Sequence, residues 1–223
     1  NIPEKKDVRV DSGVKEGNII TPFYDPMLAK LVSFAPTRRE ALLKLIDALE
    51  NTSIFGVKNN RNFLIDLLKQ KKFSDGLATT AFLEETYSHG FTDPNASSIE
   101  FVLTATLMYR EKLHHHLIGS KNVKNELIGW SNRGMLASTL TIKHLNHVKM
   151  ITILCQGENK FLARLDDMEF EIGVDEDVIR INGLVFNLIS FNKNINTYQL
   201  ITPGADFYFE EVFPSDIKTA SKK

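Results

Sequence analysis

Residues 98 to 118 have the composition of a helix whose apolar side chains face nearly every direction around the helix axis. A helix on the surface of a globular protein carries a single apolar stripe, so a helix that is apolar on most sides must be covered by other elements. The apolar positions are Ile99, Phe101, Val102, Leu103, Ala105, Leu107, Met108 and Tyr109.

After residue 126 the period of the apolar residues changes to two, which is typical of strands with one buried face. The alternation is clearest at residues 168–175, and Asn182-Gly183 is the strongest hairpin signal, because both central residues of such a turn need a positive φ. Further turns are expected at residues 157–159 and 194–196. About seven or eight short strands separated by tight turns indicate an antiparallel barrel or a strongly curved sheet. The sequence therefore predicts an antiparallel β-barrel wrapped around one long helix.

The first half of the chain mixes strands and helices. Strands are expected at residues 8–10, 19–20 and 27–34. Thr37 and Glu40 form a Thr-x-x-Glu capping box, which predicts the start of a helix that continues to Leu49.

A second helix is expected from Asn59 or Asn60 to about Gln70. Turn-forming residues dominate 88–98, so we place a domain boundary there. The predicted domains are residues 1–90 and residues 91–223.

Composition limits the partners that this chain can have. Lys and Arg number 27 against 28 Asp and Glu, so the formal net charge is −1 and no positive excess favours a nucleic acid. The lone Cys155 cannot form an internal disulfide, and no apolar run approaches the roughly 20 residues that span a bilayer. These features indicate an intracellular protein that does not bind a membrane. The chain begins without Met or a signal peptide, so we expect it to be a fragment.

Isolated reactive residues do not combine into a catalytic motif. The three histidines at 114–116 point about 100° apart on a helix and cannot converge on one metal ion. His144 and His147 are predicted to be solvated turn residues, Cys155 a small buried hydrophobe, and the two aspartates at 166–167 a turn pair. Phosphate-binding glycine loops, nucleophile elbows and zinc-protease motifs do not occur in the sequence. We therefore predict no catalytic residue and no metal ligand.

One block of the first half is much more specific. It consists of Arg9-Val10-Asp11-Ser12-Gly13-Val14, then Gly17, then Tyr24-Asp25-Pro26-Met27-Leu28-Ala29-Lys30-Leu31. The block resembles the end of the biotin carboxylase domain of biotin-dependent acyl-CoA carboxylases. The family's order and spacing continue through the helix from Arg38, Gly56, the helix from Asn60, Phe73-Ser74-Asp75-Gly76, Thr79-Thr80 and Phe82. The resemblance covers about residues 7 to 85.

The remainder is similar to the domain that joins biotin carboxylase to its carboxyltransferase partner in these subunits. This similarity depends on the position, the wrapped helix and Gly129-Trp130-Ser131-Asn132. Among the family, the α subunit of 3-methylcrotonyl-CoA carboxylase looks closest, followed by propionyl-CoA carboxylase. The implied fold class is α+β: a strand and helix remnant of the biotin carboxylase C-terminal domain, followed by the barrel around its helix.

The resemblance implies a parent ligase that carboxylates biotin with bicarbonate and MgATP and passes the carboxyl group to an acyl-CoA at a carboxyltransferase β subunit. In the family the ATP-grasp region lies upstream and the Ala-Met-Lys-Met biotin-attachment motif lies downstream, and this sequence contains neither. We therefore expect the fragment to bind no cofactor and to act as scaffold and subunit interface with the rest of the α subunit and the β subunit. The implied location is the bacterial cytoplasm or the mitochondrial matrix.

Five residues receive candidate roles from the resemblance. Arg9 and Asp25 correspond to dimer contacts, Thr79 and Thr80 lie where the family approaches the adenine pocket, and Trp130 is a candidate contact with the partner subunit. Each has a local alternative: Arg9 forms a charge pair on its strand, Asp25 is a turn residue before proline, the threonines cap the next short helix, and the tryptophan closes one end of the barrel.

A different class of function also remains open. A closed antiparallel barrel can enclose an apolar cavity, so the second half could be a small-ligand-binding protein with no enzymatic role. A helix that fills the barrel argues against this alternative, because it leaves no room for a ligand.

Overall fold

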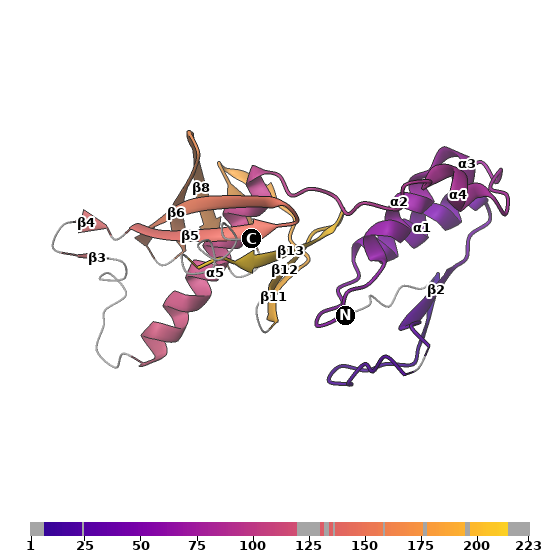
Figure 1. Ribbon diagram of the computed structural model, residues 1–223, viewed down its shortest axis with the longest axis horizontal. Helices are drawn as coiled ribbons and strands as arrows, with labels where there is room; N and C mark the ends of the chain where they lie inside the picture. The colour runs from indigo at the N-terminus through magenta and orange to yellow at the C-terminus, as the bar shows by residue number, and fades with distance from the viewer. Residues whose placement is uncertain are drawn as a thin grey trace, which may run out of the picture. The chain divides into compact units, whose positions relative to one another are not determined.

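The computed structural model describes residues 7–23, 25–119, 130–131, 134–135, 137–157, 159–175, 178–194 and 197–213 (Figure 1). The chain divides into two compact units. The first comprises Asn1–Pro94 together with Thr202–Asp206, and the second comprises Asn95–Ile201 and Phe207–Lys223. Each unit is described by itself below.

The first unit combines a two-stranded sheet with four helices. The antiparallel strands are β1 (Val8–Ser12) and β2 (Ala29–Ser33), and the helices are α1 (Arg38–Glu50), α2 (Arg61–Lys69), α3 (Lys71–Ser74) and α4 (Phe82–Thr86). The Thr37 hydroxyl accepts a hydrogen bond from the Glu40 amide at 3.2 Å, so α1 begins where the capping box predicts.

The core of the first unit lies between α1, α2 and β2. Its apolar side chains come from one face of each helix, which explains why the spacing of the apolar residues predicted both helices. The members are Leu49, Ile65 and Leu68, with Leu31, Leu42, Leu45, Ile46, Leu64 and Phe73 packed against them.

One predicted strand of the first unit is wrong. Residues 19–20 form no strand, and the Ile19 side chain is 89% exposed. The turn before them does form, since the Asn18 amide donates to the Lys15 carbonyl at 3.1 Å and Gly17 has φ +82°. A two-residue apolar run with no neighbouring strand has nothing to pair with, so β propensity alone does not fold it.

The second unit contains a nine-stranded antiparallel sheet in the order β10-β9-β8-β7-β6-β5-β13-β12-β11. Most neighbours follow one another in sequence through tight turns, as the turn signals predicted. The strands are β5 (Ala137–His144), β6 (His147–Gly157), β7 (Lys160–Leu165), β8 (Met168–Val174), β9 (Ile179–Ile181), β10 (Leu184–Phe186), β11 (Ser190–Asn194), β12 (Thr197–Ile201) and β13 (Asp206–Glu211). A separate small hairpin consists of β3 (Trp130–Ser131) and β4 (Gly134–Met135).

The sheet curls but does not close. Its outer strands β10 and β11 do not pair with each other among the described residues, so the sheet is a half-barrel where the sequence predicts a barrel. Strand β10 is only three residues long, and its Leu184 and Val185 side chains are exposed, which leaves little strand to continue the ladder.

Helix α5 (Ser98–Gly119) packs against strands β5, β6, β7, β8 and β12 of this sheet (Figure 1). Every residue from 101 to 108 is buried. This run is therefore part of the core of the second unit, while the wrapping of the sheet around the helix stays a prediction.

The Asn182-Gly183 hairpin between β9 and β10 is confirmed. Asn182 has φ +51° and Gly183 has φ +81°, as this type of turn requires. The two aspartates at 166–167 form the turn between β7 and β8, also as predicted. The other two predicted turns include residue 158 and residues 195–196, which lie outside the described residues.

Candidate functional site

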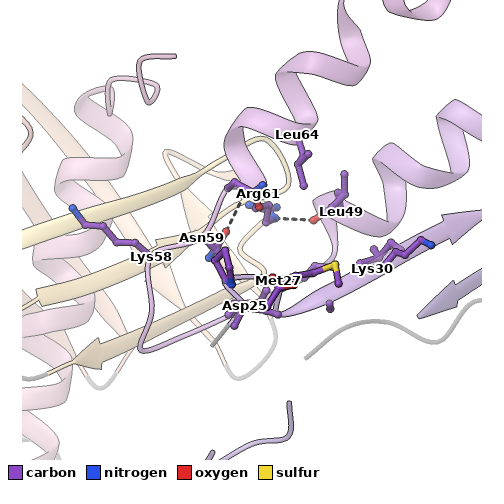
Figure 2. A pocket seen from close by; sticks show the side chains of 15 residues that line it. Asp25, Met27, Lys30, Leu49, Lys58, Asn59, Arg61 and Leu64 are labelled. Carbon is purple, nitrogen blue, oxygen red and sulfur yellow. Dashed lines mark hydrogen bonds between the residues drawn. The ribbon is translucent and has the colours of Figure 1, made fainter. Parts of the chain in front are cut away.

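A pocket of about 700 Å³ opens in the first unit beside β2 (Figure 2). Its wall comes from the segment that leads into β2, the end of α1, the connection between α1 and α2, and the start of α2. The lining residues are Asp25, Pro26, Met27, Leu28, Ala29, Lys30, Leu31, Leu49, Thr52, Ile54, Lys58, Asn59, Asn60, Arg61 and Leu64.

The charged side chains around this pocket do not converge. Figure 2 shows Lys30 and Lys58 pointing away from each other, while the Arg61 amide donates to the Asn59 side chain at 2.9 Å. The guanidinium of Arg61 is occupied by protein acceptors, as described below. The pocket is therefore mainly an apolar recess and does not have the geometry of an anion-binding site.

Arg61, the first residue of α2, is only 2% exposed. Its Nε donates to the Leu49 carbonyl at 2.7 Å and its Nη2 to the Glu50 carbonyl at 2.8 Å, both at the end of α1. The same Nη2 donates to the Thr202 carbonyl at 2.8 Å, and Nη1 forms an ion pair with the Asp206 carboxylate. A buried charge is tolerated when it is paired and hydrogen-bonded, as this guanidinium is.

The next residue, Asn62, is 8% exposed and also fully engaged. Its Oδ1 accepts from the Asp206 amide at 2.7 Å, and its Nδ2 donates to the Asp206 carbonyl and to Asp93 Oδ1, each at 3.0 Å. The first turn of α2 thereby contacts two segments, one at Asp93 and one at Asp206, that lie far apart in the sequence.

A second face of α2 carries an aromatic cluster. The Phe63 ring lies 5.1 Å from the Tyr87 ring and 5.4 Å from the Phe91 ring, both in edge geometry. The Tyr87 hydroxyl donates to Asp66 Oδ2 at 2.7 Å. Burial, followed by the hydrogen bond and negative charge of Asp66, raises the pKa of Tyr87 to about 12.

The five residues with predicted roles do not come together in one site. Asp25 lies at the pocket, where its carboxylate accepts from the Met27 amide at 2.8 Å, which is the contact of a turn residue. Arg9 is on β1 and forms an exposed ion pair with Asp11 at 3.2 Å. Both local alternatives therefore describe contacts that exist, while the dimer role stays a prediction.

Thr79 and Thr80 are exposed in the turn that precedes α4. The cap of that helix is Ala81, with no side-chain hydrogen bond, so the capping alternative for the threonines is wrong. The Thr79 carbonyl accepts from the Phe82 amide at 3.1 Å, and it is this backbone contact that starts the helix.

The backbone of Trp130 pairs with Met135 in the β3–β4 hairpin. The stretch 120–130, which joins the long helix to the strands, is our candidate contact loop for the partner subunit, and apart from Trp130 it lies outside the described residues.

The remaining histidine and cysteine side chains that were singled out in the sequence lie outside this pocket. His144 is buried, and its Nδ1 donates to the Tyr208 carbonyl at 3.0 Å while its ring lies 5.1 Å from the Phe209 ring, so the prediction that it is solvated is wrong. His147 is exposed, as predicted. Cys155 is fully buried, which confirms that it acts as a small hydrophobe. In the part of the chain that the structure describes, no group of three or more His, Cys, Asp or Glu side chains could hold a metal ion.

Nothing in the sequence pointed to Arg61 and Asn62 as organising residues. Arginine and asparagine at the start of a helix are ordinary surface residues by composition, and the partner Asp206 lies 145 residues away from Arg61. No local pattern could have connected them.

Comparison with known proteins gives the family of the first unit. Residues 1–85 match the family described as the biotin carboxylase C-terminal domain. This segment belongs to that family. The biotin carboxylase resemblance inferred from the residues is thereby confirmed.

The curated relatives include α chains of acyl-CoA carboxylases. The mitochondrial propionyl-CoA carboxylase alpha chain of Caenorhabditis elegans is 32% identical over 178 residues, which is 75% of this chain and 25% of the relative. Mitochondrial methylcrotonoyl-CoA carboxylase subunit alpha of Arabidopsis thaliana is 42% identical over 97 residues, 42% of this chain and 13% of the relative. The chain thus spans a quarter or less of the length of these relatives.

Two solved structures are similar to part of this chain. The biotin carboxylase domain of Hydrogenobacter thermophilus 2-oxoglutarate carboxylase is 36% identical and aligns with 42% of this chain and 21% of that one, with a TM-score of 0.39. Rhizobium etli pyruvate carboxylase is 31% identical over 47% of this chain and 10% of that one, with a TM-score of 0.42.

Within the part of the chain that the structure describes, no helix is long and apolar enough to cross a membrane.

Proposed function

We propose that this chain is the C-terminal part of a biotin carboxylase domain, residues 1–90, followed by a subunit-joining domain, residues 91–223, of a biotin-dependent acyl-CoA carboxylase α subunit. The main support for this proposal is the length of the sequence match to a curated relative. The match to the propionyl-CoA carboxylase alpha chain covers 178 residues, whereas the biotin carboxylase family covers residues 1–85. The similarity therefore continues into the second unit.

The second unit would act as scaffold, with the curled sheet wrapped around α5. The complete burial of residues 101–108 supports this role. A protein that binds a small ligand inside a barrel needs an open lumen, so the same burial disfavours the ligand-binding alternative.

The parent protein would carboxylate biotin with bicarbonate and MgATP and pass the carboxyl group to an acyl-CoA at a carboxyltransferase β subunit. Relatives named for propionyl-CoA and methylcrotonoyl-CoA support an acyl-CoA as the final acceptor, with 3-methylcrotonyl-CoA as our first candidate. The mitochondrial names of these relatives support the mitochondrial matrix, or the cytoplasm if the source is a bacterium.

We expect the chain to be inactive alone, because transfer of a phosphoryl group depends on charge stabilisation by phosphate-binding and metal-binding residues. In the family these residues belong to the ATP-grasp region, so no catalytic step is assigned to the residues of this chain.

In the parent protein, Arg9 and Asp25 would lie at a dimer contact and Thr79 and Thr80 near the adenine of the nucleotide. The exposure of all four side chains is compatible with contacts to other parts of the assembly. Trp130 would contact the partner subunit.

The decisive experiment compares the full-length gene product with residues 1–223. Each is incubated with biotin ligase and then assayed for bicarbonate-dependent ATP hydrolysis. We expect both activities only in the full-length protein, because the biotin-attachment motif and the phosphate-binding residues are absent from this sequence. Biotinylation of the shorter chain would contradict the domain assignment, and a full-length protein with neither activity would contradict the proposed function.

A further inference from the structure

The start of α2 contacts the end of α1 through one side chain, in addition to the Thr52 amide, which donates to the Leu49 carbonyl at 3.0 Å. The last carbonyl groups of a helix have no partner within the helix. At the end of α1, the Arg61 guanidinium donates to two of them, Leu49 at 2.7 Å and Glu50 at 2.8 Å. Arg61 therefore fixes the corner between the two helices.

The same guanidinium holds a turn that lies far away in sequence. It donates to the Thr202 carbonyl at 2.8 Å and to the Pro203 carbonyl at 3.3 Å, and it pairs with the Asp206 carboxylate. The side chains of Arg61 and Asp206 are each 2% exposed. Removing one member of such a pair leaves a buried charge without compensation, so each charge depends on the other.

Arg61 binds the charge of the turn, and Asn62 binds its backbone. Its side-chain amide accepts from the Asp206 amide at 2.7 Å and donates to the Asp206 carbonyl at 3.0 Å, as a neighbouring strand would. Hydrogen bonds to both the amide and the carbonyl of one residue leave its backbone little freedom to move. Asn62 therefore fixes the position of Asp206.

The turn is also ordered by its own hydrogen bonds. The Thr202 amide donates to the Ala205 carbonyl at 2.9 Å, and the Ala205 amide donates to the Thr202 hydroxyl at 3.2 Å. The turn therefore presents its carbonyls in a fixed geometry, which lowers the entropic cost of binding them.

We propose that Arg61 and Asn62 form an anchoring site for the turn Thr202–Asp206, and that the corner between α1 and α2 depends on this turn for its stability. The family match ends at residue 85, yet the counter-ion of Arg61 at the α1–α2 corner lies in this later segment. This anchoring is independent of which acyl-CoA the parent protein uses.

Hydrogen exchange measured by mass spectrometry on the whole chain tests the proposal. The variants are Asp206→Asn, which removes the charge, and Asn62→Ala, which removes the two backbone contacts. We expect both to raise the exchange rates of amides in α1 and α2 at least about tenfold, because protected amides exchange through local opening. The control is Asp175→Asn, whose carboxylate pairs with Arg180 at 2.9 Å and is 58% exposed, and it should leave those rates unchanged.

Faster exchange confined to β12 and β13, with α1 and α2 unchanged, would overturn the proposal, since the corner between α1 and α2 would then not depend on the turn. If Asp206→Asn prevents folding, the milder Asn62→Ala gives the result. A double variant with Arg61→Met and Asp206→Leu removes both charges and should exchange more slowly in α1 and α2 than Asp206→Leu alone. Equal rates in these two variants would show that the ion pair does not stabilise the corner.

Discussion

At the scale of single residues, two buried polar side chains organise their surroundings. Arg61 is enclosed by carbonyl groups and Asp206, and His144 by the Tyr208 carbonyl and aromatic rings. Burying a polar group is costly unless its hydrogen bonds are made, so each of these side chains requires a specific set of partners. A residue type that is usually exposed thus becomes a marker of a defined local structure.

Tyr87 leads to a prediction about pH. Because its pKa rises from 10.0 to about 12 in the folded chain, the protonated hydroxyl stabilises the fold. That contribution is complete below pH 10.0 and is lost as the pH rises through about 12. We expect the difference between the ultraviolet pH titrations of the parent chain and Tyr87→Phe to show a phenol with a midpoint near pH 12.

The cause of that shift can be tested separately. Asp66→Asn removes the negative charge next to the hydroxyl and should lower the midpoint of Tyr87. Glu85→Gln, at an exposed pair with Lys72, should leave it unchanged. A midpoint of 10.0 in the parent chain would show that the hydroxyl is not buried against Asp66.

At the scale of elements, α5 carries the core of the second unit. Leu103 and Met108 are both 0% exposed. We expect Leu103→Ala and Met108→Ala each to lower the free energy of unfolding by about 2–5 kcal/mol, as truncations of buried side chains do. Urea denaturation followed by circular dichroism measures the change. The control is Leu184→Ala on β10, whose side chain is 76% exposed and should change stability by less than about 0.5 kcal/mol. Equal stability of all three variants would contradict the buried helix.

Elements with strong local signals were predictable from sequence. The capping box at Thr37 and the Asn182-Gly183 turn each specify a backbone geometry within a few residues, and both form as expected. The prediction of a strand at residues 19–20 was wrong, because a strand needs a partner that the local sequence does not reveal. The prediction of a closed barrel was wrong for the same reason, since closure depends on the pairing of β10 with β11.

The candidate site was harder to predict than the fold. The resemblance led to Asp25, which does line the pocket. Arg61 and its contacts depend on a residue 145 positions away, and such pairings appear only when the chain is folded. Long-range polar contacts are therefore the part of this protein that one sequence cannot supply.

At the scale of the whole molecule, Trp130 offers a test of the subunit-joining role. Tryptophan is enriched at interface hot spots, where truncation costs at least about 2 kcal/mol, a factor of about 30 in affinity. We expect Trp130→Ala in the full-length α subunit to weaken binding to its β subunit by about that factor, measured by co-purification and titration. Leu184→Ala is the matched control on an exposed strand. Unchanged binding by a folded variant would contradict the assignment of Trp130 while leaving the family match intact.

The limits of the first unit lead to a final prediction about chain length. A chain that ends at Pro94 keeps Arg61 but lacks the turn Thr202–Asp206, which belongs to the same compact unit. In residues 1–223, Arg61→Met should destabilise the first unit by about 3–5 kcal/mol, because it leaves Asp206 buried without its partner.

In residues 1–94 the same substitution should cost less than about 1 kcal/mol, since the counter-ion is already gone. Amide exchange in α1 and α2 measures both values, with Lys72→Met at an exposed ion pair as the control in each chain. An equal loss in the long and short chains would mean that Arg61 acts only on the end of α1, and that the turn contributes nothing to the stability of this unit.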